Sequence, residues 1–279
     1  ENPARCFLCP PPHMLWGGDG MKRGVWLALA ALGCHTLCLD CDITLRNLDL
    51  ALGLSDRALM DFSDVLDGRC TLAAAENGGD IKYVALTFDD GPSPRCTPQL
   101  LDGLKERGVR ATFFVVGCQV VKDPDIVIRM AQEGHQVGNH SYDHQELDKL
   151  SCGAAEEDMR RNDELLQELL GEGDYWVRPP YGLLSEEACA AAATPIINWS
   201  VDTEDWKSKD AEKILDIIYR ETGDGDIILL HDRYLNSVEA ALRAVDHLQQ
   251  QGYRFVTVAE LLAWKGVEPT AGEVYRCAK

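Results

Sequence analysis

The sequence lacks an excess of basic residues. Its 27 lysines and arginines stand against 46 aspartates and glutamates in 279 residues, which gives a net charge of −19. Nucleic acids and anionic membrane surfaces repel so acidic a chain, so we expect no nucleic-acid partner. A neutral or weakly charged polymer suits this surface better than a polyanion does.

The sequence also lacks an apolar run long enough to span a bilayer. The segment GVWLALAALGC, which ends at Cys34, has about eight apolar residues in a row, whereas a spanning helix needs about 20. Because Lys22 and Arg23 precede it, the pattern is typical of a short secretory signal over about residues 21–34. We therefore expect an extracytoplasmic protein, secreted or associated with the cell wall or membrane, that contacts the membrane only through this signal or a lipid anchor at Cys34. A short buried helix is the alternative.

The sequence lacks an even set of cysteines as well. There are 11 of them, whereas an exported protein in an oxidising compartment would more often carry a paired set. Cys6 and Cys9, like Cys38 and Cys41, have the C-x-x-C spacing of a structural zinc site or a redox pair. Unpaired thiols are the simpler interpretation.

No internal repeat divides the chain, but its pattern changes at residue 80. Residues 1–80 are expected to be a poorly structured N-terminal segment that ends in the linker AAAENGGD, and residues 266–279 a C-terminal tail. Between them, over residues 81–265, apolar segments alternate with amphipathic ones. We predict strands at 82–88, 111–117, 136–138, 175–177, 195–200, 226–230 and 253–256, and helices at 97–107, 124–133, 151–170, 185–193, 211–221, 237–250 and 259–264. Seven or eight strand–helix units indicate an α/β domain with a parallel sheet closed into a barrel.

The stretch TFDDG places two adjacent carboxylates, Asp89 and Asp90, at the end of the first predicted strand. Neighbouring side chains at a strand end point to different sides, and adjacent carboxylates resist joint ionisation unless a cation or hydrogen bonds compensate. The pair therefore indicates a metal ligand beside a general base. An ordinary Asp-Gly-Pro turn is the alternative.

Four more polar motifs follow predicted strands: HSYDH at 140–144, RPPYG at 178–182, DTEDW at 202–206 and LLHD at 229–232. The carboxyl ends of barrel strands meet on one face, so we expect the motifs to form one site. His140 and His144 are spaced i and i+4, which one helical turn would aim at a common point. With one carboxylate they would make a three-ligand catalytic metal site, although two surface histidines on a helix would have the same spacing.

This set of motifs resembles that of the polysaccharide deacetylase family, the NodB-homology domain of carbohydrate esterase family 4, over about residues 82–262. The resemblance implies a distorted (β/α)7 barrel. It also implies one divalent metal ion held by Asp90, His140 and His144. Zinc fits this donor set, with cobalt, nickel and manganese as alternatives.

The resemblance also assigns catalytic roles. Asp89 would be the general base, paired with Arg178. His231 would be the general acid, oriented by Asp202, and the backbone N–H of Tyr181 would stabilise the oxyanion. The substrate would contact Trp206, Leu230, Pro179 and Tyr181. Taken singly, the residues have simpler interpretations: the Arg-Pro-Pro segment as a turn, Trp206 as a core aromatic and Asp205 as a helix cap.

These features predict a hydrolase acting on carbon–nitrogen bonds of linear amides. It would remove N-acetyl groups from the N-acetylglucosamine residues of a polysaccharide, with peptidoglycan expected first. Chitin or a chito-oligosaccharide is the next candidate, and acetylated xylan the third, because ester and amide cleavage use the same machinery. An inactive carbohydrate-binding protein is the alternative from another class, and it would be expected to have lost a ligand or the acid.

Overall fold

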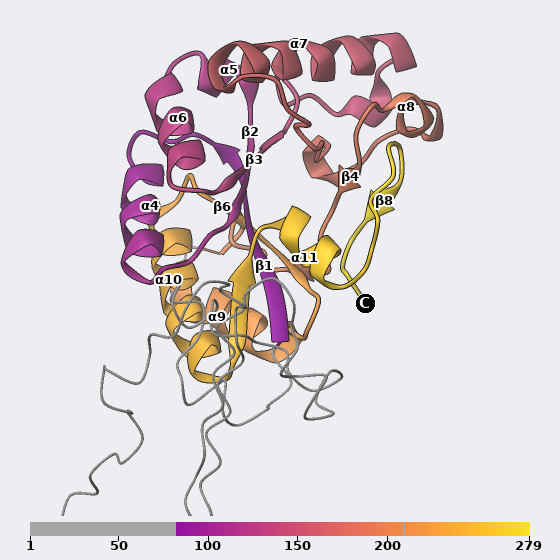
Figure 1. The fold of residues 1–279 in the computed structure, drawn as a ribbon. Helices are drawn as coiled ribbons and strands as arrows, with labels where there is room; N and C mark the ends of the chain where they lie inside the picture. Colours follow the sequence, from indigo (N-terminus) through magenta and orange to yellow (C-terminus); the bar gives the residue numbers. More distant parts are fainter. Residues whose placement is uncertain (1–81, 209) are drawn as a thin grey trace, which may run out of the picture. The chain divides into compact units, whose positions relative to one another are not determined.

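The structure, a computed structural model, describes residues 82–208 and 210–279, and the fold is given for these residues (Figure 1). The predicted signal, the linker and both C-x-x-C pairs lie outside them. Residues 81–279 form one compact unit.

The centre of the domain is β1 (Lys82–Gly91), whose apolar run KYVALTF is buried along most of its length. On one side β1 pairs in parallel with β2 (Thr112–Val115), and β2 pairs with β3 (Gln136–Asn139). On the other side it pairs with β6 (Ile227–His231), which in turn pairs with β5 (Val201–Asp202). The amino-terminal half of β1 also pairs with β7 (Tyr253–Val256). A continuous apolar strand is expected at this central position, because both faces of a covered parallel sheet are buried.

Isolated bridges extend the sheet from β3 to β4, and the chain connection from β4 to β5 completes a distorted barrel. Asn139 at the end of β3 pairs in parallel with Val177, and Val177 pairs with Ile196 of β4 (Ile196–Ile197). The chain then runs directly from β4 into β5, whose partner β6 returns to β1. The predicted α/β barrel is thus confirmed, with the strand expected at 175–177 reduced to a bridge.

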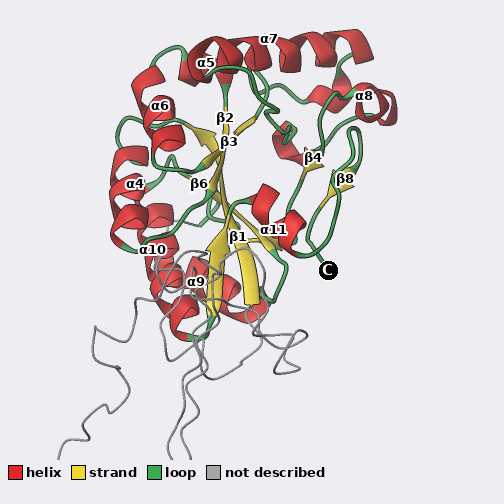
Figure 2. Ribbon diagram, in the orientation of Figure 1, coloured by secondary structure: helices red, strands yellow, loops and turns green. Residues whose placement is uncertain are grey.

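Helices cover the outside of this sheet (Figure 2). They are α4 (Thr97–Glu106), α5 (Gly117–Val120), α6 (Pro124–Gln132), α7 (Cys152–Leu170), α8 (Glu186–Ala191), α9 (Ala211–Glu221), α10 (Leu235–Gln250) and α11 (Val258–Trp264), with short 3₁₀ turns η2 (Leu147–Lys149) and η3 (Pro180–Gly182). The ends follow local chemistry: a proline lies in the first turn of α4 and α6, and Thr257 and Glu260 form a capping box on α11. None of these helices, within the described part of the chain, has the length and apolarity that a membrane span requires.

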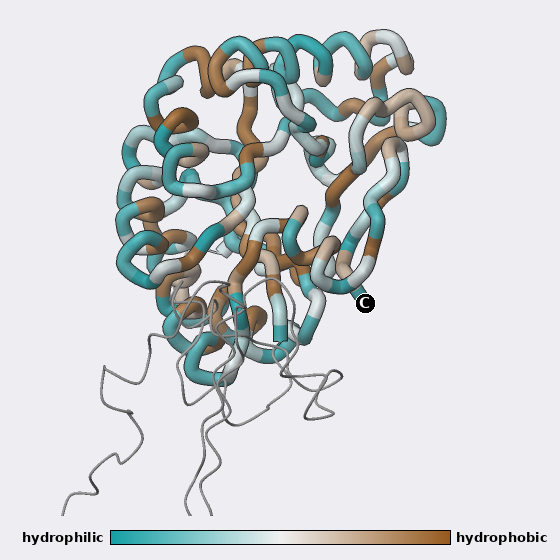
Figure 3. The backbone as a smooth tube through the Cα atoms, viewed as in Figure 1, coloured by the Kyte–Doolittle hydropathy of each residue, from teal (hydrophilic) through white to brown (hydrophobic). Residues whose placement is uncertain are grey.

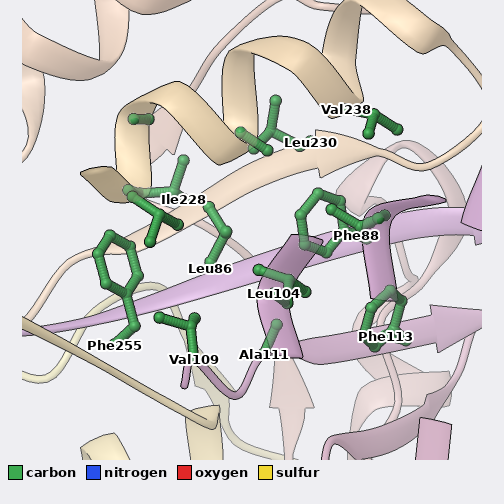
Figure 4. Packing of buried hydrophobic residues seen from close by; sticks show 14 of the residues in the cluster. Leu86, Phe88, Leu104, Val109, Ala111, Phe113, Ile228, Leu230, Val238 and Phe255 are labelled. Atoms are coloured by element: carbon green, nitrogen blue, oxygen red, sulfur yellow. The ribbon is translucent and has the colours of Figure 1, made fainter. Parts of the chain in front are cut away.

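The hydrophobic core lies between the strands and the helices. The residues of the inner strands are mostly hydrophobic, whereas those of α7 are largely hydrophilic (Figure 3). Phe88 and Leu86 of β1, Phe113 of β2 and Leu230 of β6 pack together in one cluster of buried residues, with side chains from α4 and α10 (Figure 4). This packing fixes the strand ends, from which the polar motifs project.

The C-terminal residues belong to the same domain. The segment β8 (Val274–Tyr275) pairs in parallel with β4. The backbone of Cys277 forms an isolated antiparallel β-bridge with Asp226, just before β6. Ala278 is only 2% exposed and packs in a core cluster. The expectation of a separate tail over residues 266–279 was therefore wrong. Two-residue strands carry too little periodicity to be recognised in a sequence.

Candidate active site

The two aspartates of β1 point to different partners, as their position at a strand end predicted. Asp89 is 2% exposed, and its Oδ1 accepts a hydrogen bond of 2.8 Å from Arg178 Nη1. Asp90 has a left-handed backbone (φ 70°) and faces His140 and His144. A simple turn does not explain this arrangement, because both carboxylates meet buried polar groups, and His140 Nε2 lies near both, 3.7 Å from Asp89 Oδ2 and 3.5 Å from Asp90 Oδ1.

Asp90, His140 and His144 form a group of three metal-ligating side chains. Their ligand atoms all lie within 4.8 Å of one another. His144 Nε2 lies 3.0 Å and His140 Nε2 3.5 Å from Asp90 Oδ1. Burial raises the pKa of Asp90, but the two imidazoles outweigh burial and hold that pKa well below its usual range. The carboxylate is therefore ionised and available as a ligand.

The histidine motif is a loop, not the predicted helical turn. Ser141 (φ 64°) and His144 (φ 54°) both have left-handed backbones, which interrupt any helix. The loop is held by side chains instead: Asn139 Oδ1 accepts from the Ser141 N–H, and Asp158 Oδ2 accepts from the Tyr142 N–H. The i, i+4 spacing therefore led to the two candidate ligands through a helical turn that the structure does not contain. Asn139 and Asp158 were missed, because no spacing in the sequence links them to the loop.

Arg178 joins the two halves of the site. Its guanidinium is fully buried and donates to Thr87 Oγ1, to Asp89 Oδ1 and to the carbonyls of Ile197 and Asn198. Its own carbonyl lies 2.7 Å from His140 Nδ1. Since a carbonyl only accepts, His140 Nδ1 must carry the proton, which leaves the Nε2 lone pair directed at the metal group. One residue thus orients both the predicted base and a predicted ligand, so the segment is more than a turn.

His231 is oriented by Asp205, not by Asp202 as predicted. Asp205 Oδ1 accepts from His231 Nδ1 at 2.7 Å, and its Oδ2 accepts from the His231 backbone N–H at 2.8 Å. Asp202 is exposed and accepts only from the Glu204 N–H among the described residues. The cause is the backbone path, since Glu204 (φ 50°) turns the chain so that Asp205 enters the site. Asp205 is not a helix cap either, because Asp210 caps α9.

The pairing with Asp205 sets the protonation state of His231. Burial lowers the pKa of His231, but the hydrogen bond and charge of Asp205, with the charges of Asp89 and Asp90, raise that pKa to about 9. His231 is thus protonated at neutral pH and can donate a proton through Nε2. It lies beside the predicted base, because Asp89 and His231 are register partners on β1 and β6.

Leu230 does not line the site. It is fully buried and packs beside Val238 of α10 and Phe88, on the outer face of the sheet (Figure 4). Side chains alternate along a strand, so Leu229, two residues before His231, shares the face that carries the acid. Leu229 is 3% exposed and belongs to none of the core clusters of the described residues. The assignment of Leu230 was wrong by one residue, although the period of two could have shown it.

Of the other residues predicted to contact the substrate, Trp206 and Tyr181 are exposed and Pro179 is buried. Trp206 is 57% exposed, so it is not a core aromatic. Tyr181 is 58% exposed, has a left-handed backbone (φ 60°) and packs its ring edge-on against His144, with centroids 5.1 Å apart. Pro179 is buried and accepts from the Gly182 N–H, so it shapes the turn and offers no surface to a substrate. The use of the Tyr181 N–H as an oxyanion donor stays a prediction.

The three candidate ligands fit a divalent cation. Asp90 Oδ1 is buried without a hydrogen bond of good geometry to any described residue. Two imidazole nitrogens and one carboxylate oxygen are a donor set typical of catalytic metal sites. His135, by contrast, lies apart from this group. It is buried, accepts from the Ala111 N–H and has a pKa lowered to about 4 by burial.

Comparisons with known proteins agree with this geometry. The profile of the family described as Polysaccharide deacetylase matches residues 76–195. A peptidoglycan-N-acetylmuramic acid deacetylase from Bacillus subtilis is 42% identical over 180 residues, covering 64% of this chain and 38% of the relative. A peptidoglycan-N-acetylglucosamine deacetylase from Bacillus cereus is 35% identical over 192 residues, covering 66% of this chain and 90% of the relative.

A solved structure gives the same result. A family 4 acetyl xylan esterase from Clostridium thermocellum, in complex with a cobalt ion, has a TM-score of 0.67 and 32% identity, covering 70% of this chain and 98% of that one. The chain spans only about two fifths of the length of the longer curated relatives. The Bacillus cereus relative is 35% identical to this chain over nine tenths of its own length, and the family profile and the shared fold agree with it. The chain therefore belongs to the polysaccharide deacetylase family.

Proposed function

We propose that this protein is a metal-dependent deacetylase that hydrolyses the N-acetyl groups of N-acetylglucosamine-containing polysaccharide, with peptidoglycan as the substrate. One observation supports this above all. Two groups suited to proton transfer, Asp89 paired with Arg178 and His231 held protonated by Asp205, lie on neighbouring strand ends beside the Asp90, His140 and His144 group. Peptidoglycan is favoured because the named relatives act on it.

The proposed reaction uses the two side chains that have charged partners, Asp89 and His231. A divalent cation on Asp90, His140 and His144, zinc on donor preference, would supply a Lewis acid that polarises the amide carbonyl and acidifies water. Asp89 takes a proton from the attacking water while the oxygen of that water forms a bond to the acetyl carbonyl carbon. His231 then protonates the leaving nitrogen as the carbon–nitrogen bond breaks. The products are acetate and a free amine on the sugar.

Each held group depends on its partner. Without Arg178, the buried carboxylate of Asp89 would lose the charged hydrogen-bond partner that orients it as a base. A buried His231 without Asp205 would lose its proton and stop acting as an acid. Both proton-transfer residues therefore have a dedicated charged partner, and a non-catalytic sugar-binding protein would need neither.

The predicted extracytoplasmic location agrees with this substrate, since the wall polymer lies outside the cytoplasm. The predicted signal over about residues 21–34 stays a prediction.

The decisive experiment measures acetate release from three polymers: peptidoglycan, N-acetylated chito-oligomers and acetylated xylan. We expect release that a chelator abolishes and added zinc restores, with peptidoglycan fastest. Asp89→Asn should lose turnover but retain bound metal, whereas His144→Ala should lose the metal, measured by elemental analysis. Asp202→Asn is the matched control, because this exposed aspartate contacts neither group. Full activity in Asp89→Asn would overturn the proposal, and preference for xylan would make the protein an esterase.

A further inference from the structure

Arg233 is a cationic side chain beside the reaction centre for which the proposed chemistry has no use. It follows His231 by two residues, and its side chain is 51% exposed. Arg233 Nη1 lies 3.6 Å from Asp90 Oδ2, which is beyond hydrogen-bonding distance. The guanidinium makes no hydrogen bond to any residue in the described part of the chain. Its donors therefore face the solvent next to Asp90.

The other charges near Arg233 already have partners. Asp89 is paired with Arg178, and Asp205 with His231. Asp90 faces two imidazoles and, in the proposed function, a cation as well. Neutralising these acids therefore does not require Arg233. In a chain with a net charge of −19, a half-exposed guanidinium whose one ionic contact, with Asp90 at 3.6 Å, lacks a hydrogen bond needs another explanation.

The surface around Arg233 is suited to a sugar polymer. Tyr234 and Leu235, at the start of α10, are 40% and 38% exposed. The loop of Trp206, itself 57% exposed, is tied to this segment, because Asn236 Nδ2 donates to the Ser208 carbonyl at 3.0 Å. Exposed aromatic rings bury the apolar faces of sugars, while a guanidinium adds a forked donor that matches a carboxylate.

We infer that Arg233 is a specificity-determining residue that pairs with a carboxylate on the substrate, next to the N-acetyl group that is cleaved. The inference rests on the proposed function and narrows its substrate class to acetylated sugars that carry carboxylates, as a muramic acid unit does through its lactyl group where no stem peptide is attached. Neutral polymers such as chitin or acetylated xylan have no carboxylate with which the guanidinium could pair.

The same side chain has the right chemistry for a second carboxylate, the acetate that the reaction releases. The two sources differ in what they change. A substrate carboxylate affects the preference between charged and neutral substrates of equal length, whereas acetate affects product inhibition and treats all substrates alike.

The test compares wild type with Arg233→Gln, Arg233→Lys and Arg220→Gln. Arg220 is the matched control, because it is a 62% exposed arginine on α9 that pairs with Asp216. Each protein receives three oligosaccharides of equal length: one of N-acetylglucosamine alone, one with alternating muramic acid units bearing free lactyl carboxylates, and the latter with its carboxylates amidated. The readouts are kcat/KM for acetate release, the inhibition constant of added acetate, and the dissociation constant of each oligosaccharide by calorimetry.

We expect Arg233→Gln to lower the ratio of kcat/KM between the free-carboxylate and amidated oligosaccharides about tenfold, which corresponds to about 1.4 kcal/mol. Arg233→Lys should restore part of this ratio, because it retains the charge but loses the forked geometry. Rising salt concentration should reduce the preference of the wild type for the free-carboxylate over the amidated oligosaccharide, but should not change that of Arg233→Gln.

An unchanged ratio in Arg233→Gln, or the same loss in Arg220→Gln, would overturn the inference. So would an unchanged ratio combined with weaker acetate inhibition, which would assign the guanidinium to the product. If wild type released no acetate from any oligosaccharide, the proposed function would fail. The ratio of dissociation constants would then decide the role of Arg233 by itself.

Discussion

Replacing Asp205 by asparagine tests the pairing that gives His231 its proton. The side chain of Asp205 is fully buried, and both of its oxygens accept hydrogen bonds from His231. Asparagine has the same shape but no charge. Without the charge, burial dominates, and we expect the pKa of His231 to fall from about 9 to 6.5 or lower.

The size of the effect follows from this pKa. A value of about 9 against the ordinary 6.5 corresponds to about 3 kcal/mol of preference for the protonated imidazole in the folded protein. Because the folded-state pKa of His231 is raised, this stabilisation is fully present below pH 6.5 and is lost as the pH rises through 9. Asp205→Asn should therefore be less stable than wild type by up to about 3 kcal/mol at pH 7, and the gap should shrink towards pH 10.

Two measurements check this on chelator-treated protein. NMR titration of the His231 imidazole gives its pKa directly, and urea unfolding at pH 7 and pH 10 gives the difference in stability. Asp202→Asn is the control, because Asp202 is exposed at the end of β5, in the same motif, and has no hydrogen bond or ion pair with His231. A His231 pKa that stays near 9 in Asp205→Asn, or one that falls equally in Asp202→Asn, would refute the reasoning.

Three further changes test the packing of the site. Arg178→Met leaves Asp89 buried without its partner, so we expect a loss of about 3–5 kcal/mol in urea unfolding together with loss of acetate release; a loss below 1 kcal/mol would contradict the pairing. Gly91→Ala places a methyl group where the Asp232 carboxylate lies, so we expect a loss of about 1–3 kcal/mol, and unchanged stability would show that this carboxylate moves freely. Burial raises the pKa of Asp232 to about 7, so its contribution to stability is present below pH 3.8 and is lost as the pH rises through 7. Asp232→Asn should flatten this part of the stability profile, and an unchanged slope between pH 4 and 8 would count against the assignment.

The sequence alone determined the fold class and the location of the site. Alternating apolar and amphipathic segments indicate strands covered by helices, and this local periodicity predicted α9 and β7 with the bounds that the structure has. Polar motifs after successive strands had to meet on one face, because parallel strands all end there. On this basis, and on the family resemblance, the sequence predicted the five candidate residues that the structure brings together: Asp89, Asp90, His140, His144 and His231.

Only the tertiary structure decided which of several nearby side chains makes each contact. Asp202 and Asp205 are equivalent aspartates in the motif DTEDW, and the left-handed turn at Glu204 selects Asp205 for His231. The two histidine ligands converge through a loop held by Asn139, a long-range arrangement that leaves no local period. Arg178 reaches Asp89 across 89 positions of the chain. Contacts between segments so far apart depend on backbone paths that packing fixes, and spacing in a sequence does not encode them.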